Sequence, residues 1–338
     1  VSQSVTAQND CDESGAGTGI NDPNDAECFV DSTNGIDSTL IQSNDATGAD
    51  NAAQTNELSI AQVADLENNC DEFEEGFNAV FCNLPEADRN DIETDAIEQS
   101  NEAFGSASAA ISQNNQIDGD DALGIPGISQ SIVASNTCGQ TGDGDNFANC
   151  ELISNINAIV DEVSQSNFVS DADDGTTVSQ DNGLVISQSM DVENDCDENT
   201  FTDTHDNNAN CIQDEFLDND LEEVSQGNDV EALDNSISDQ DNNVAISQDL
   251  LADNDCNGTG GNDVECTNDG FEAGFGGIDD FNFIDIIDQS NSATLAGDVS
   301  SVQLNDLVID QGGDLVNTCD ETGGGVNQAT CGNIDLVQ

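Results

Sequence analysis

Cysteine and carboxylate side chains are the groups in this sequence whose types and spacing could do chemistry. The twelve cysteines form six close pairs, and none stands in a Cys-x-x-Cys string. Zinc ribbons and thioredoxin-like sites use that string, so we expect disulfides made in an oxidising compartment instead. The predicted disulfide loops join Cys11 to Cys28, Cys70 to Cys82, Cys138 to Cys150, Cys196 to Cys211, Cys256 to Cys266, and Cys319 to Cys331.

The carboxylates suggest cation binding. The chain has 72 Asp and Glu against one Lys or Arg, a formal charge of −71. Calcium accepts six to eight oxygen ligands in flexible geometry. We therefore predict Ca²⁺ at the acidic loops and at the Asp residues that directly follow the first cysteine of four pairs. The candidate ligands are Asp12, Asp71, Asp118, Asp120, Asp143, Asp145, Asp171, Asp173, Asp197 and Asp320. None of these loops has the EF-hand string, and the alternative is a solvated acidic surface with diffuse counterions.

The composition argues against several functions. Nucleic-acid binding needs cationic side chains, and this chain has only Arg89. A phosphate-binding loop built around Lys is impossible, and His205 is the single His available for acid–base chemistry, so we do not expect an enzyme. No run of about 18 apolar residues is present, so no membrane span is expected.

An internal repeat organises the chain. The first cysteine of each pair recurs at intervals of 58 to 68 residues, which predicts one elongated domain of six units (1–59, 60–127, 128–185, 186–245, 246–308 and the incomplete 309–338). Each first cysteine follows a Gln, five residues, an Asn and one residue. These Gln are Gln3, Gln62, Gln130, Gln188, Gln248 and Gln311, and the Asn are Asn9, Asn68, Asn136, Asn194, Asn254 and Asn317. Complete units carry two further Gln-x-Asn strings, such as Gln42-Ser43-Asn44 and Gln54-Thr55-Asn56.

Short β-branched segments precede these Gln residues and alternate apolar with polar residues, as strands do. Strands that recur in a fixed order, with variable loops in fixed places, predict an all-β fold of the repeat β-solenoid type, with a disulfide loop in each unit. Equivalent Gln and Asn would then stack into hydrogen-bonded ladders, although the same residues also suit solvated turns. Residues 155–163 could be helix or strand, and each unit could make one coil or two.

The string Gln289-Ser290-Asn291-Ser292-Ala293 and its counterparts resemble curlin repeats. Curlin repeats are about a third as long as these units and lack the cysteine loops. The resemblance implies stacked β-solenoid coils that assemble into extracellular fibres.

These features together predict a secreted structural protein at the cell surface, with Val1 exposed by removal of a signal peptide. The open ends of a solenoid can add another copy, so the expected partner is the chain itself in a head-to-tail filament, stabilised by divalent cations. Such a filament would serve attachment, biofilm formation or cell–cell contact. The alternatives are a monomeric acidic calcium-binding adhesin or surface-layer component, and a mineral-associated protein with little fold.

Overall fold

The structure is a computed structural model, and it describes most of the chain as strands. The described residues are 2–13, 24–29, 33–36, 40–47, 52–73, 78–84, 88–93, 97–104, 110–117, 127–142, 146–170, 176–200, 206–234, 237–259, 261–269, 282–296, 300–322 and 328–333. They contain nineteen strands and, within these ranges, no helix. The predicted all-β class is therefore confirmed, and 155–163, which the sequence left open, lie inside a strand.

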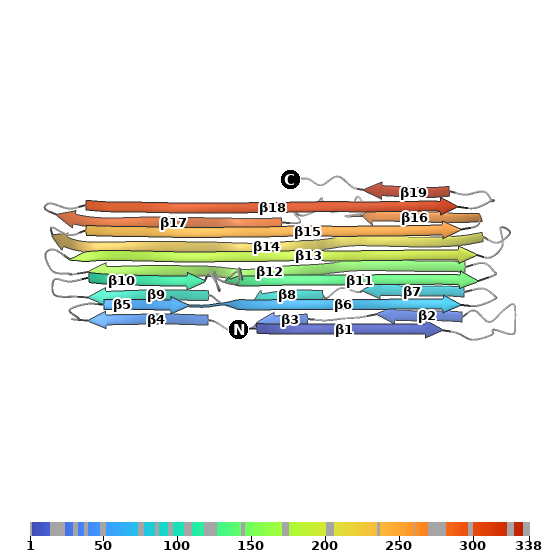
Figure 1. Cartoon of the computed structure of the whole chain (residues 1–338), viewed down its shortest axis with the longest axis horizontal. Helices are drawn as coiled ribbons and strands as arrows, with labels where there is room; N and C mark the ends of the chain where they lie inside the picture. Colours follow the sequence, from blue (N-terminus) through green and yellow to red (C-terminus); the bar gives the residue numbers. More distant parts are fainter. Residues whose placement is uncertain are drawn as a thin grey trace.

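Two sheets contain all of these strands. The eight-stranded sheet, called sheet A here, consists of β1 (Ser2–Glu13), β5 (Ala52–Glu57), β6 (Ile60–Phe73), β10 (Ala110–Ile117), β11 (Ile128–Gly142), β13 (Thr177–Thr200), β15 (Ile237–Thr259) and β18 (Ser300–Thr322). The strands lie along the long axis of the molecule, and successive strands follow one another from β1 to β18 (Figure 1).

The eleven-stranded sheet, called sheet B, lies against sheet A. Its strands are β2 (Asn24–Phe29), β3 (Thr33–Ile36), β4 (Leu40–Thr47), β7 (Asn78–Leu84), β8 (Asp88–Glu93), β9 (Ile97–Phe104), β12 (Asn146–Ser170), β14 (Asp206–Asp234), β16 (Gly261–Asp269), β17 (Asn282–Ala296) and β19 (Gln328–Asn333). The short strands β2, β3 and β4 lie end to end along the length that β12 or β14 spans alone (Figure 1).

Every described strand pair is parallel, and the register joins residues about 60 positions apart. Gln62 lies opposite Gln3 on one side and Gln130 on the other, and Cys70 likewise lies between Cys11 and Cys138. Each stretch of about 60 residues therefore adds one layer to sheet A and one layer to sheet B.

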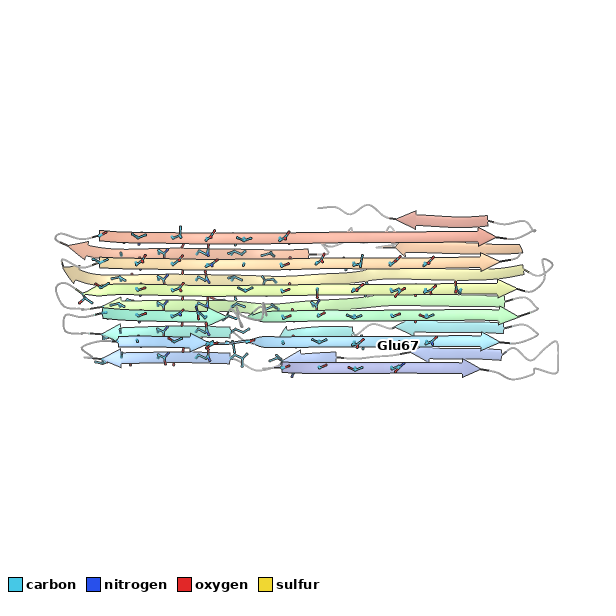
Figure 2. The ribbon with its side chains drawn as sticks, in the orientation of Figure 1. Glu67 is labelled. Carbon is cyan, nitrogen blue, oxygen red and sulfur yellow. The ribbon has the colours of Figure 1, made fainter. Side chains whose placement is uncertain are left out.

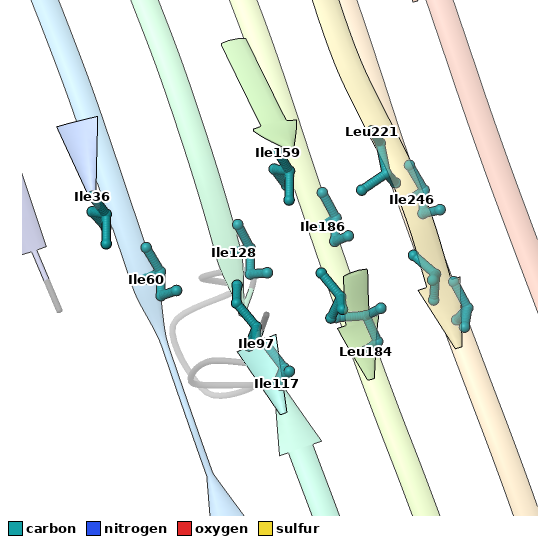
Figure 3. Packing of buried hydrophobic residues seen from close by; sticks show 13 residues of the cluster. Ile36, Ile60, Ile97, Ile117, Ile128, Ile159, Leu184, Ile186, Leu221 and Ile246 are labelled. Atoms are coloured by element: carbon teal, nitrogen blue, oxygen red, sulfur yellow. The ribbon is translucent and has the colours of Figure 1, made fainter. Parts of the chain in front are cut away.

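The core lies between the two sheets, because alternate residues of each strand are buried. In β13, the side chains from Val178 to Cys196 at every second position are buried, and those between them are more exposed. Isoleucine, leucine and valine from both sheets form one central cluster, which includes Ile60, Ile128, Ile186 and Ile246 stacked across sheet A (Figure 3). A second cluster around Ile111, Val178 and Val230 lies toward one end of the strands.

Candidate assembly site: amide columns and sheet edges

Glutamine side chains form three hydrogen-bonded columns in the core, each running from layer to layer. In the Gln62 column, each Nε2 donates to the Oε1 of the preceding layer at 2.7 to 3.5 Å. The Gln54 column of sheet A and the Gln42 column of sheet B repeat this pattern at 2.7 to 3.0 Å. The members of the three columns are, respectively, Gln3, Gln62, Gln130, Gln188, Gln248 and Gln311; Gln54, Gln113, Gln180, Gln240 and Gln303; and Gln42, Gln99, Gln165, Gln226 and Gln289.

The glutamine columns also connect the two sheets. Gln130 Nε2 donates to the Ala158 carbonyl of sheet B at 2.9 Å, and Gln188 Nε2 donates to the Asn157 carbonyl at 3.0 Å. One amide group thus serves the preceding layer and the opposite sheet at once. A buried amide that lost these partners would be destabilising by about 1 to 3 kcal/mol, so the columns fix both the register and the spacing of the sheets.

Asparagine side chains form a second network beside the Gln42 and Gln54 columns. Asn115 Nδ2 of sheet A donates to Asn167 Oδ1 of sheet B and to Asn182 Oδ1 of the next layer, both at 3.0 Å. Asn167 Nδ2 in turn donates to Asn182 Oδ1 at 2.9 Å. This zigzag includes Asn44, Asn56, Asn101, Asn115, Asn167, Asn182, Asn228, Asn242, Asn291 and Asn305.

The two kinds of amide point in opposite directions along the stack. In the bonds that join like side-chain amides, each glutamine donates to the layer before it, whereas each asparagine of the zigzag donates to the layer after it. The Asn68, Asn136 and Asn194 side chains follow the asparagine direction, with 3.0 Å between each donor and acceptor. The stack therefore has a chemical polarity in addition to the parallel direction of its strands.

The structure brings some of the sequence-predicted site residues together and leaves others outside the described side chains. All six predicted ladder glutamines belong to the Gln62 column, and Asn68, Asn136 and Asn194 bond to one another. Asn9, Asn254 and Asn317 occupy equivalent backbone positions, but their side chains are not among those described. The sequence did not predict that the later Gln-x-Asn strings face each other from opposite sheets. Their near-constant separation along the chain could have indicated a strand–turn–strand arch.

The predicted cysteine pairs divide between the sheets. The first cysteines lie in register in sheet A, and the second cysteines, Cys28, Cys82, Cys150, Cys211, Cys266 and Cys331, lie in register in sheet B. Cys70, Cys138 and Cys196 are buried and disulfide-bonded. The side chains of Cys11, Cys256, Cys319 and the six sheet B cysteines lie outside the described set.

Most of the predicted calcium ligands fall outside the described residues. These are Asp118, Asp120, Asp143, Asp145, Asp171 and Asp173. Asp12, Asp71 and Asp320 lie in strands, but their side chains are not described. Asp197 lies opposite Gly139 of β11 on one side and Asn257 of β15 on the other. Among the described residues, no group of three or more His, Cys, Asp or Glu is placed to hold a metal ion.

Carboxylates on the outward face of sheet A are mostly kept apart by neutral residues. Glu67 on β6 (Figure 2) lies beside Gln8 of β1 and Ser135 of β11. On β18, the positions beside Asp239, Asp241 and Asp253 carry neutral side chains, namely Val302, Leu304 and Val316. Asp249 also has a neutral neighbour on β18, Gly312, where a Cβ atom would come within 3.1 Å of Asp249 Oδ1. Two unit charges about 4 Å apart repel by about 1 kcal/mol even in bulk water, which favours this spacing.

The contact between β13 and β15 holds most of the exceptions. There, Asp181 lies opposite Asp241, Glu193 opposite Asp253, and Asp195 opposite Asp255. Burial raises the pKa of Asp195 to about 6, and the charges of Asp197, Asp255, Glu193 and Asp253 add to the effect. Oδ1 of Asp195 is buried and has no hydrogen-bond partner. This strand pair therefore carries electrostatic strain. Between β1 and β6, Asp12 likewise lies opposite Asp71.

The strand β18 forms an edge of sheet A among the described strands. Its side chains from Ser300 to Gln311 are exposed, whereas the equivalent inward positions of β15 are buried. Val302 is 59% exposed, Leu304 54% and Val308 53%. Leu307 and Ile309, which continue the columns of Val244 and Ile246, are also exposed. The core columns thus reach a surface at β18.

Comparisons with known proteins leave this arrangement without a named relative: no family model, curated protein or solved structure matches the chain. The described part of the chain also has no helix of the length and apolar character needed to cross a membrane.

Proposed function

We propose that this chain is a structural subunit of an extracellular filament, built by stacking copies head to tail along the axis of the amide columns. The observation that carries the proposal is that buried Gln and Asn bond from layer to layer through the described sheets. Identical layers joined by identical contacts can be extended by a further copy without a new kind of interface.

In this proposal the layers are coils of a β-solenoid, and each predicted unit closes one coil. The first cysteine of a unit lies in sheet A and the second in sheet B, so the six predicted disulfides would tie the sheets together near one end of the strands. Such ties restrict the unfolded chain and suit a secreted protein whose charge disfavours a compact state.

Cations have a defined part in the proposed filament. A formal charge of −71 opposes any association of two copies, and divalent ions at the acidic surface would reduce that repulsion. Calcium is our proposed ion because carboxylate oxygens are its usual ligands. The role of the filament would be attachment, biofilm formation or cell–cell contact, and it requires no catalytic residue.

Negative-stain electron microscopy of the oxidised protein tests the proposal. We expect long, uniform filaments in millimolar calcium, and a parallel sample with EGTA shows whether calcium holds them together. Filaments that persist in EGTA would assign their cohesion to the amide columns and backbone pairing. Isolated short rods in calcium would contradict the filament and favour the monomeric calcium-binding adhesin.

A further inference from the structure

We propose that the copy-to-copy joint lies between β18 of one copy and β1 of a second copy, with Gln3 of the second copy placed over Gln311. This inference rests on the filament proposed above and assigns its contact surface, register and polarity. The partner is a second copy of this chain, because β1 has the column glutamine that β18 would need and, from Ser2 to Gln8, a neutral outward face.

The first argument is continuity of the Gln62 column. Within one copy, the later layer donates to the earlier one, and Gln311 Nε2 donates to Gln248 Oε1 at 2.7 Å. At the other end of the column, Gln3 Oε1 accepts from Gln62 Nε2. Continued across the joint, the same direction makes Gln3 Nε2 of the second copy donate to Gln311 Oε1. A joint between two C-terminal edges would oppose the strand directions as well as the amides.

The second argument is the spacing of charge on the outward face. The described outward residues of β1 are Ser2, Ser4, Thr6 and Gln8, which are exposed and uncharged. With Gln3 over Gln311, Ser2 lies beside Asp310, Ser4 beside Gly312, and Thr6 beside Asp314. This neutral half of β1 then covers an acidic part of β18, as β11 does between β6 and β13. Farther along, the same register places Asp12 over Asp320, just as Asp12 lies opposite Asp71 within one copy.

The proposed contact is that of β1 (Ser2–Glu13) with β18. In the proposed register, β1 covers β18 from Asp310 to Glu321. β5 belongs to the second layer of its copy, together with β6, because β5 pairs with β10 and β6 pairs with β11. β1 forms the first layer, on the other side of β6. Leu304 therefore lies outside the proposed contact.

Ser2 and Asp310 give the sharpest test. Ser2 neighbours Ala61 in its own copy and, by the proposed register, Asp310 in the next. Ser2→Asp adds a carboxylate at the joint alone, whereas Thr55→Asp adds one to the exposed face of β5 outside the joint. Leu304→Asp tests the uncovered half of β18. Polymerisation of the full chain in calcium is followed by pelleting, and circular dichroism checks that each variant is folded.

We expect Ser2→Asp to raise the critical concentration by about fivefold to tenfold at low salt, with the difference shrinking as salt is added. Thr55→Asp and Leu304→Asp should polymerise like the parent chain. The double variant, Ser2→Asp with Asp310→Ser, should have the critical concentration of the parent chain, because one carboxylate of the facing pair is removed.

The outcomes separate this joint from the filament itself. If the parent chain polymerises but Ser2→Asp does so equally well at low salt, the proposed joint is wrong while the filament stands. If Leu304→Asp blocks polymerisation and Ser2→Asp does not, the contact lies along the other half of β18. A parent chain that stays monomeric in calcium overturns the filament, and the joint with it.

Discussion

The inward and outward faces of the same strands follow opposite stacking patterns. Inward, like residues stack on like: Gln130 on Gln62, and Asn182 on Asn115. Outward on sheet A, carboxylates are mostly separated by neutral neighbours, and the exceptions are Asp12 opposite Asp71 and the contact between β13 and β15. An amide both donates and accepts a hydrogen bond, so identical amides satisfy one another, whereas an ionised carboxylate only accepts. Among buried polar side chains, the ability to donate as well as accept thus favours repetition in successive layers.

Gln130→Glu should give the largest effect, because it places an acceptor-only carboxylate in the inward column. The carboxylate would lose the bonds that Nε2 donates to Gln62 Oε1 and to the Ala158 carbonyl. We expect the free energy of unfolding to fall by about 3 to 5 kcal/mol, as when a buried charge loses its partner. Chemical denaturation measures the change.

Gln116→Glu is the matched control for that substitution. Gln116 is also a strand glutamine of sheet A, but its side chain is partly exposed on the outward face. Its new carboxylate would lie beside Glu57, so it should lower the stability by no more than about 1 kcal/mol at low salt. Equal losses in the two variants would contradict the difference between the faces.

Ser135→Glu should break the outward pattern on β11. The new carboxylate would lie between Glu67 and Glu193, making a row of three charges. We expect a loss of about 1 to 2 kcal/mol at low salt, which declines as the ionic strength rises. Thermal unfolding at several salt concentrations measures this. Ser135→Gln serves as the neutral control, and a loss that salt does not reduce would assign the effect to packing instead.

Ser238→Val should sharpen the inward pattern by removing a local exception. Ser238 is fully buried, its Oγ has no hydrogen-bond partner, and it occupies the column of Ile111 and Val178. We expect a gain of about 1 kcal/mol, because the buried hydroxyl is removed and apolar volume is added. Denaturation midpoints compare this variant with Ser238→Ala, which should give part of the gain. A destabilised valine variant would mean that the site is too small.

Asp195→Asn should give the smallest effect and test the strained contact between β13 and β15. Since the pKa of Asp195 is raised from 3.8 to about 6, the folded state holds its proton more tightly than the unfolded state. Its contribution to stability is therefore present below about pH 4 and is lost as the pH rises through 6. The asparagine variant should be more stable than the parent at pH 7, by under about 1 kcal/mol, since this group is partly exposed.

The pH profile of the difference checks that sign. The gain should disappear below about pH 4, where Asp195 is protonated in both states of the parent. A gain that is constant across this range would assign the effect to hydrogen bonding of the asparagine amide instead of to charge.

The sequence predicted the strand class because period-two segments around each Gln leave little helical pattern. It also identified the residues that stack, since the Gln-to-Cys spacing recurs in all six units. It did not reveal that Asn115 and Asn167 face each other, because contact between sheets depends on the turn that joins them. Asp195 was likewise missed, because its pKa is raised chiefly by burial, then by Asp197 and by Asp255, and both the burial and the approach of Asp255, 60 residues away, appear only when the layers are aligned.

A cryo-electron microscopy reconstruction of filaments grown in calcium would test the central claim most directly. We predict that β1 of each copy follows β18 of the previous copy at about 4.8 Å, the ordinary spacing of paired strands, with Gln3 beside Gln311. The glutamine column would then run unbroken through the joint, in a single polarity. Filaments whose copies meet side by side, or through two like ends, would contradict this account.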